Sequence, residues 1–241
     1  MMGDVIGILL GLMFFAIPLL IIGAIVYFIL KFKGGTSINF SYRGALRVYF
    51  YVVTLVCVGL VVGGVSTLLQ VGFGEAIGRE FSYGDVYADH EHVQERILDC
   101  QKNVPEYSGV KDDYCPDLSP YEARSLAEKV EFEMKSSLIN GISLTLIGSF
   151  LLLLHLFGRR WVETNVERSD LLRKLYLGAG LAVFAVVTIA ALTIGVPAAL
   201  RYAVLEVDPD HGSPGEPLSI AIVALPVWLT YLAATIRTTR S

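Results

Sequence analysis

Hydrophobic positions along the chain gather in long runs that carry almost no charge, separated by polar stretches. The first run covers residues 5–30 and contains no charged residue. At 1.5 Å of rise per residue, about 20 helical residues cross a hydrocarbon core roughly 30 Å thick, so this run is long enough to span a membrane. The same criterion predicts spanning helices at residues 45–73, 138–157, 175–204 and 218–236. The pattern therefore predicts an all-α polytopic membrane protein with five transmembrane helices.

One long polar stretch, residues 75–137, divides these runs into a pair and a trio. It holds 15 Asp and Glu against 7 Lys and Arg, a net charge of −8. So acidic a segment lacks the positive bias that keeps a loop in the cytosol, and we expect it on the extracytoplasmic side. The chain is thus divided into residues 1–74, with two spans and a loop at 31–44, the acidic segment 75–137, and residues 138–241 with three spans.

Two helices are expected within the acidic segment, where they would form a small helical cap. Residues 91–102 place apolar side chains on one face, as in a short amphipathic helix. Ser119, Pro120 and Glu122 then combine an N-cap serine, a proline at the first helical position and a glutamate at the capping-box position. We expect a helix to begin there and to continue into the third span.

Positive charges in the connections set the predicted orientation. All four charges in the first connection, Lys31, Lys33, Arg43 and Arg47, are positive, and residues 159–174 hold five basic against three acidic residues. Basic loops stay in the cytoplasm, which places the N-terminus outside and the C-terminus inside the plasma membrane. An aromatic belt at residues 49–51 would mark the inner interface.

Composition narrows the class further. Hydrophobic residues make up 54% of the chain, and the mean hydropathy is +0.59. Both values exceed what a soluble domain accommodates and make the lipid bilayer the first partner. The formal net charge of −4 argues against a nucleic-acid partner.

Two of the three cysteines, Cys100 and Cys115, lie in the acidic segment with 14 residues between them. In an oxidising compartment they would form a structural disulfide that constrains the unfolded chain by roughly 3 kcal/mol. Free thiols are the next interpretation, and a redox pair is also compatible with the two cysteines, although the spacing is not that of a CxxC motif.

Glycines at four-residue spacing predict close helix packing. Gly7 and Gly11 share one face of the first span, and Gly59 and Gly63 share one face of the second. Small residues at this spacing let helix backbones approach, within one chain or between subunits.

Candidate chemistry inside the predicted spans is sparse. They contain no Asp, Glu or Lys between the interfaces, and His155 is expected to hydrogen-bond near the inner interface. Buried ionisable groups are the usual mark of catalysis or ion coupling in a membrane, so we expect a protein that is not an enzyme and needs no cofactor. Polar residues in spans three and four would line a pore in an oligomer, or simply bond to neighbouring backbone: Asn140, Ser143, Thr145, Ser149, Thr188 and Thr193.

Outside the spans, His90, His92 and His211 lie next to carboxylates in two segments on the same predicted side. Imidazole nitrogen with carboxylate oxygen suits zinc or copper. His90 and His92 would share a face in an extended segment, which makes the three histidines a candidate metal site.

The stretch from Gly35 to Tyr51, with Phe40-Ser41-Tyr42-Arg43-Gly44 at its centre, resembles the opening of a bacterial multi-pass membrane-protein domain of unknown function. The likeness covers residues 35–64. It implies a bacterial membrane protein and transfers no site residue.

These features favour a non-enzymatic structural or accessory subunit of a larger membrane complex, bound to partner subunits or to copies of itself. An oligomeric channel or small-solute transporter is the first alternative. The second is an extracytoplasmic sensor or metal-binding membrane protein.

Overall fold

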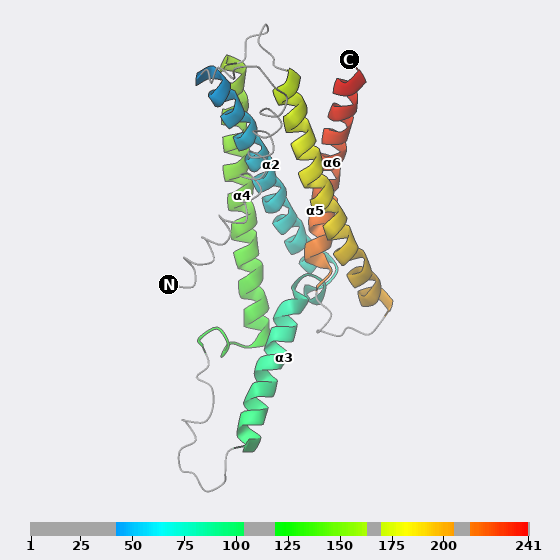
Figure 1. Cartoon of the computed structure of the whole chain (residues 1–241). Coiled ribbons are helices and arrows are strands. Elements are labelled where there is room, and N and C mark those ends of the chain that lie inside the picture. Colours follow the sequence, from blue (N-terminus) through cyan, green and yellow to red (C-terminus); the bar gives the residue numbers. More distant parts are fainter. Residues whose placement is uncertain (1–41, 104–118, 163–169, 205–212, 241) are drawn as a thin grey trace. The chain divides into compact units, whose positions relative to one another are not determined.

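The computed structural model describes residues 42–103, 119–162, 170–204 and 213–240, and all regular secondary structure in these ranges is α-helical. The helices are α2 (Tyr42–Ala76), α3 (Arg79–Asn103), α4 (Leu126–Val162), α5 (Asp170–Val204) and α6 (Gly215–Arg240) (Figure 1). The chain divides into two compact units, Met1–Leu46 and Arg47–Ser241, and the packing described below lies within the second. The predicted all-α class is confirmed, whereas the first predicted span lies outside the described residues.

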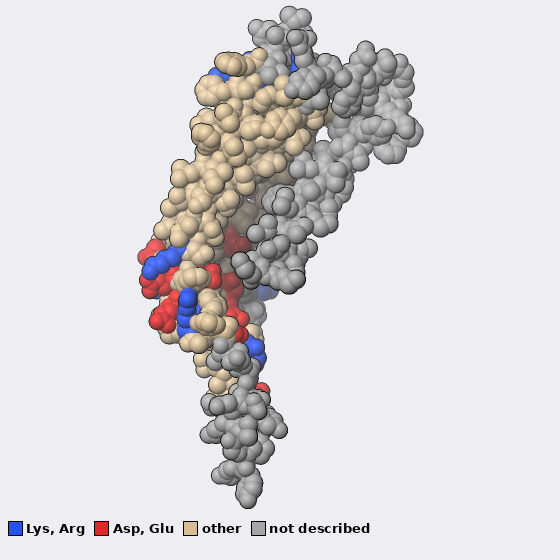
Figure 2. Space-filling view, turned by 90° about the vertical axis from the view of Figure 1, so that its left-hand side faces the viewer, with Lys and Arg blue, Asp and Glu red and all other residues tan. Residues whose placement is uncertain are grey.

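Four of these helices, α2, α4, α5 and α6, are long and apolar enough to cross a membrane: Leu46–Ala76, Leu126–Trp161, Leu172–Val204 and Gly215–Arg240. They correspond to the last four of the predicted spans. Figure 2 shows a face on which the acidic residues gather at one end of a wide uncharged band, while basic residues lie at both ends. Such a band is what a helix needs to lie in hydrocarbon.

Helix α2 approaches α4 closely through glycines on both sides of the contact. A Cβ atom added at Gly64 would lie 2.5 Å from the Thr145 Oγ1 atom and 2.9 Å from the Gly141 carbonyl oxygen. Further along α4, a Cβ at Gly148 would lie 3.0 Å from the Val61 side chain. Missing side chains therefore let the two backbones approach, which is how helices associate in lipid.

The sequence predicted Gly59 and Gly63 as the packing residues of α2, whereas the contact with α4 uses Gly64. No described residue lies within 4 Å of a Cβ added at Gly59 or at Gly63. One residue is 100° of helical rotation, so Gly63 and Gly64 face different directions. Within the described residues the contact uses Gly64, and any packing at Gly59 and Gly63 stays a prediction. Gly7 and Gly11 lie outside the described residues.

Another side of α2 contributes to the main apolar core, which it shares with α5 and α6. The buried members of this core are Val62, Leu177, Phe184, Ala224 and Tyr231. Gly180 of α5 makes room for it, because the Tyr231 ring occupies the space that a Cβ there would need. The Tyr231 ring stacks on Phe184 with centroids 5.6 Å apart.

A chain of aromatic contacts extends from this core to α4. The Tyr231 and Tyr176 hydroxyls are 2.8 Å apart, and the Tyr176 ring lies 4.9 Å from Tyr51. Arg159 donates to the Tyr51 hydroxyl at 2.8 Å, with its guanidinium 4.2 Å from the ring centroid. Tyr51 is only 7% exposed and packs between the helices, while Tyr49 is exposed. Three successive helical residues point in three directions, so their exposed fractions differ. The belt concerns depth in the membrane and stays a prediction.

Helix α3 starts after a tight turn at Gly78, whose φ of +151° lies in a region that side chains disfavour. The helix spans 25 residues, so the amphipathic segment predicted at residues 91–102 is only its last half. Tyr83 has non-helical torsion angles (φ −133°, ψ 31°) and marks a kink one turn after the start.

Helix α4 begins at Leu126, six residues after the predicted first helical residue, Pro120. The capping box between Ser119 and Glu122 does form, with the Ser119 amide donating to the Glu122 carboxylate at 2.9 Å and the Glu122 amide donating to Ser119 Oγ at 3.2 Å. It closes a single turn, however, and a second capping box at Ser125 and Glu128 starts the helix at Leu126. From there α4 continues for 37 residues without a break, as the predicted extension into the third span requires.

Candidate functional site

A pocket of about 430 Å³ lies where four helices meet at the polar end of the apolar band. We call it the acidic pocket. Its lining combines four carboxylates with two tyrosines, two further polar residues and a valine: Asp85, Asp89, Glu133, Glu216, Tyr83, Tyr121, Gln70, Ser137 and Val86. None of the nine is basic.

The kink in α3 helps to position one wall. Tyr83 and Val86 are buried against Val130 of α4, which fixes the first turns of α3 beside that helix. Asp85 and Asp89, four residues apart, then share the face that borders the pocket.

Hydrogen bonds and a close contact join the remaining walls. Gln70 of α2 donates to the Ser82 carbonyl at 2.9 Å, and Ser82 Oγ donates to the Gln70 carbonyl at 2.9 Å. A Cβ at Gly215 would lie 2.6 Å from Ser82 Oγ, so the start of α6 sits directly on this pair. The next residue, Glu216, thereby reaches the pocket.

The pKa values of both pocket tyrosines, Tyr83 and Tyr121, are raised by their surroundings. The Tyr121 hydroxyl donates to Glu133 at 3.1 Å. The pKa of Tyr121 is raised to about 12, mainly by partial burial and then by Glu133 and the more distant aspartates. The pKa of Tyr83 is raised as well, mainly by burial, although the neighbouring Ser137 hydroxyl opposes the shift. Burial is the largest cause of both shifts, and the carboxylates add to it through their negative charge.

One basic side chain lies beside the pocket without lining it. Lys129 is fully buried, and its ammonium group lies 5.5 Å from the centroid of the Tyr121 ring. Among the described residues this ammonium has no hydrogen-bond partner. Its contact with an aromatic face is a cation–π interaction.

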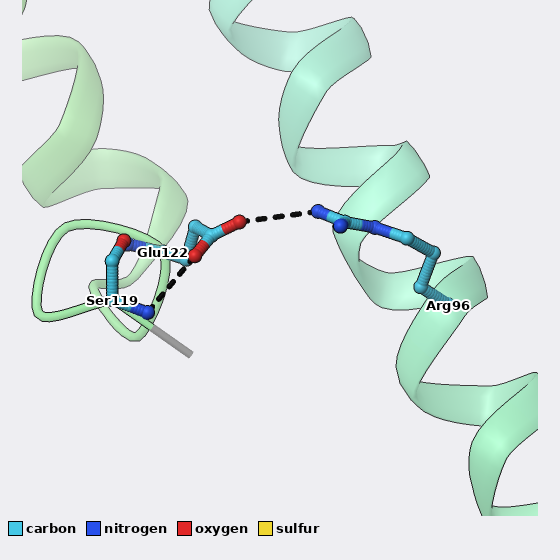
Figure 3. Close-up of polar contacts among 3 residues, drawn as sticks. All are labelled: Arg96, Ser119 and Glu122. Atoms are coloured by element: carbon cyan, nitrogen blue, oxygen red, sulfur yellow. Dashed lines mark hydrogen bonds and ion pairs between the residues drawn. The ribbon is translucent and has the colours of Figure 1, made fainter. Parts of the chain in front are cut away.

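The turn that carries Tyr121 is fixed to α3 by an ion pair. Arg96 donates to the Glu122 carboxylate at 3.1 Å, while the other carboxylate oxygen accepts from the Ser119 amide (Figure 3). The bonds from Ser119 and then the Arg96 guanidinium hold the pKa of Glu122 below its usual value. One carboxylate therefore caps the turn and links it to a second helix.

The predicted histidine site has a different local geometry from the one expected. His90 and His92 lie in α3, where two residues subtend about 200°, so they do not share a face. The His92 Nδ1 atom lies 3.8 Å from Glu95, and His211 is outside the described residues. Within the described ranges, no three His, Cys, Asp or Glu residues are placed to hold a metal ion.

Other predicted residues are found in less distinctive surroundings. Cys100 lies in α3, while Cys115 is outside the described residues, so the disulfide stays a prediction. His155 contacts the Leu151 carbonyl at 2.7 Å and the Tyr49 hydroxyl at 3.3 Å, as expected of a hydrogen-bonded histidine. Thr193 donates to the Ile189 carbonyl of its own helix, as in the simple packing interpretation.

Sequence reasoning missed the acidic pocket because its lining comes from separate elements. The nearest signal in the sequence was the i, i+4 pair of Asp85 and Asp89. From sequence alone this pair indicates a solvated helix face, because the sequence does not show that α4 and α6 also border the pocket.

Four membrane-length apolar helices with a polar pocket at one end define the class as a helical protein with a membrane location. No family model matches the chain, and comparison with curated proteins and solved structures gave no significant match.

Proposed function

We propose that the chain is a non-enzymatic integral membrane protein that serves as a structural or accessory subunit of a larger membrane assembly. The observation that carries this proposal is the exposed face of α4. Large apolar side chains recur there at three- to seven-residue spacing, each more than half exposed: Ile139, Leu146, Phe150, Leu153 and Phe157.

The contrast with the other spans supports this assignment. In the most apolar part of α4 only 11% of residues are buried, against 28% for α2, 28% for α5 and 22% for α6. The glycines of α4 face α2, whereas the large side chains point away from it. Lipid solvates such a face, and a partner helix with small residues packs on it more tightly.

The proposed orientation places the acidic pocket, α3 and the start of α4 outside a bacterial plasma membrane, as an extracytoplasmic cap. Arg159 and Arg160 in the last turn of α4, and Arg237 and Arg240 in that of α6, support a cytoplasmic location for those ends. In this orientation Cys100 and Cys115 lie in an oxidising compartment, so we propose their disulfide as part of the cap.

Gentle detergent extraction from the native membrane, followed by native mass determination, tests the accessory role. We expect a particle that contains other subunits in fixed stoichiometry. The matched variants are Phe150→Trp on the exposed face of α4 and Val187→Trp among the side chains packed in the main core. Phe150→Trp should release the partners from a chain that stays folded, whereas Val187→Trp should unfold it. Recovery as a lone monomer or a homo-oligomer would contradict the accessory role.

The acidic pocket favours one second candidate, an extracytoplasmic sensor that binds a small ligand. Its volume lies in the range of small-ligand pockets, and its lining is more polar than is usual for them.

A further inference from the structure

We propose that the turn at residues 119–125, which precedes α4, is a strap that is closed over the ammonium group of Lys129 and poised to open. Lys129 lies in the first turn of α4. Its side chain is fully buried, and its ammonium group lies 5.5 Å from the centroid of the Tyr121 ring, which the strap carries. The inference rests on the contacts of this turn and not on the accessory role, so either proposal can fail without the other.

The buried ammonium group makes the closed strap costly. In the part of the chain that the structure describes, Lys129 Nζ has no hydrogen-bond partner. An ammonium group carries three N–H donors, and burying them without acceptors costs free energy. The Tyr121 ring recovers part of that cost through a cation–π contact, but a ring face does not replace the hydrogen bonds of water. Because opening lets water reach Lys129, this cost favours the open strap.

Two contacts with α4 hold the strap closed. The Tyr121 hydroxyl donates to the Glu133 carboxylate at 3.1 Å. At the other end of the strap, the Arg124 guanidinium lies 4.8 Å from the centroid of the Phe132 ring. Both contacts join the strap to the part of α4 that follows Lys129, so the strap is folded back over that residue.

The third contact is the ion pair between Arg96 and Glu122, which joins the strap to α3 (Figure 3). Ion pairs near the surface contribute little stability and are screened by salt. Modest closing contacts therefore oppose the cost of burying Lys129, which makes local opening of the strap accessible without unfolding of the helices. Because Tyr121 also lines the acidic pocket, opening removes one wall of that pocket.

Amide hydrogen exchange at residues 121–124 of the purified full-length protein in detergent, measured against the intrinsic exchange rate, tests the proposal. Lys129→Met removes the charge and keeps a long, unbranched side chain. We expect exchange in the strap to become about fivefold slower, because the closed state no longer buries an unpaired charge. The matched control is Lys135→Met, the same change at an exposed position of α4, which should leave exchange in the strap unaltered.

The reactivity of the Lys129 amine reports the same opening independently. Acylation by an amine-reactive ester, quantified by peptide mass spectrometry, should be at least about tenfold slower at Lys129 than at the exposed Lys135, because Lys129 reacts only from the open state. Glu122→Gln should raise the Lys129 rate about two- to fivefold, since it removes one closing contact. Glu91→Gln, an exposed change of the same kind on α3, should not. Thermal melting of each variant confirms folding.

Three results would overturn the proposal. One is unaltered or faster exchange in Lys129→Met, which would show that the buried ammonium does not oppose closure. Another is equal slowing in Lys135→Met, which would indicate a general effect of removing positive charge. The third is an unaltered Lys129 acylation rate in Glu122→Gln while exchange at residues 121–124 becomes faster, which would show that the strap does not cover Lys129.

Discussion

The apolar bundle of α2, α4, α5 and α6 and the polar end around α3 are stabilised in different ways. In the bundle, backbones and rings approach where glycine leaves space, as at Gly64 and Gly180. At the polar end, two consecutive capping boxes and the Arg96–Glu122 ion pair fix a turn over a small core around Val130. We therefore expect the bundle to be sensitive to an added methyl group and the polar end to charge and pH.

The largest effect is expected for Gly64→Ala. The new Cβ would meet the Thr145 amide nitrogen at 2.6 Å and the Gly141 carbonyl oxygen at 2.9 Å, and backbone atoms cannot move aside cheaply. Overpacking of this kind costs about 2 kcal/mol. The free energy of unfolding in mixed micelles, measured by titration with a denaturing detergent, should fall by that amount.

Gly63→Ala is the control for that experiment. No described residue lies within 4 Å of a Cβ at this position, so the free energy of unfolding should stay the same or rise slightly. Equal losses for the two variants would contradict the α2–α4 contact, and a loss confined to Gly63→Ala would favour the packing face expected from sequence.

A somewhat smaller effect is expected for Gly180→Ala. The Tyr231 ring must shift to admit the methyl group, which disturbs its stacking on Phe184 and its contact with the Tyr176 hydroxyl. Because a ring can move more easily than backbone, the expected loss is about 1 kcal/mol.

Gly178→Ala, on the same helix with no described residue within 4 Å, is the matched control. Near-ultraviolet circular dichroism should change in Gly180→Ala only, since tyrosine surroundings change only there. An unaltered spectrum in Gly180→Ala would show that Tyr231 does not occupy this space.

The smallest effect, and the one that sharpens the contrast, is expected for Glu122→Gln. It removes the ion pair with Arg96 and weakens the cap, so amide exchange at residues 121–124 should become about two- to fivefold faster. Glu91→Gln, an exposed change of the same kind on α3, should have no effect on exchange there.

The pH dependence of this contact has a definite sign. The folded pKa of Glu122 lies below its usual 4.5, so the stabilisation is present above pH 4.5 and is lost as pH falls through the folded value. The protection of these amides in wild type, measured against the intrinsic exchange rate at the same pH, should therefore fall at acid pH and approach that of Glu122→Gln. A wild type that stays protected at low pH would rule out the ionised contact.

The hydrophobic pattern was sufficient to predict the last four spans because each is a long apolar run with few charges. It could not choose between Gly63 and Gly64, since both lie in that run and only the position of α4 decides which one is covered. The capping box at Ser119 was read correctly as a hydrogen-bonding pattern but wrongly as the helix start. A second box at Ser125 and Glu128, equally visible in the sequence, starts α4.

The acidic pocket was beyond prediction for a related reason. Its carboxylates come from α3, α4 and α6, and no spacing in the sequence shows that Glu133 and Glu216 border the same space. For the histidine site the error was the opposite one. His90 and His92 are close in the sequence and were expected to share a face, but in the helix α3 they point in different directions.

The central claim is that α4, α5 and α6 each cross the membrane, so that α3 and the end of α6 lie on opposite sides. Labelling with a membrane-impermeant maleimide tests it most directly, using Glu91→Cys on α3 and Thr239→Cys near the end of α6 in a background whose three native cysteines are replaced by serine. The account predicts that Glu91→Cys is labelled in intact cells, whereas Thr239→Cys is labelled only after permeabilisation. Labelling of both sites in intact cells would contradict the three crossings, and labelling of Thr239→Cys alone would contradict the proposed orientation.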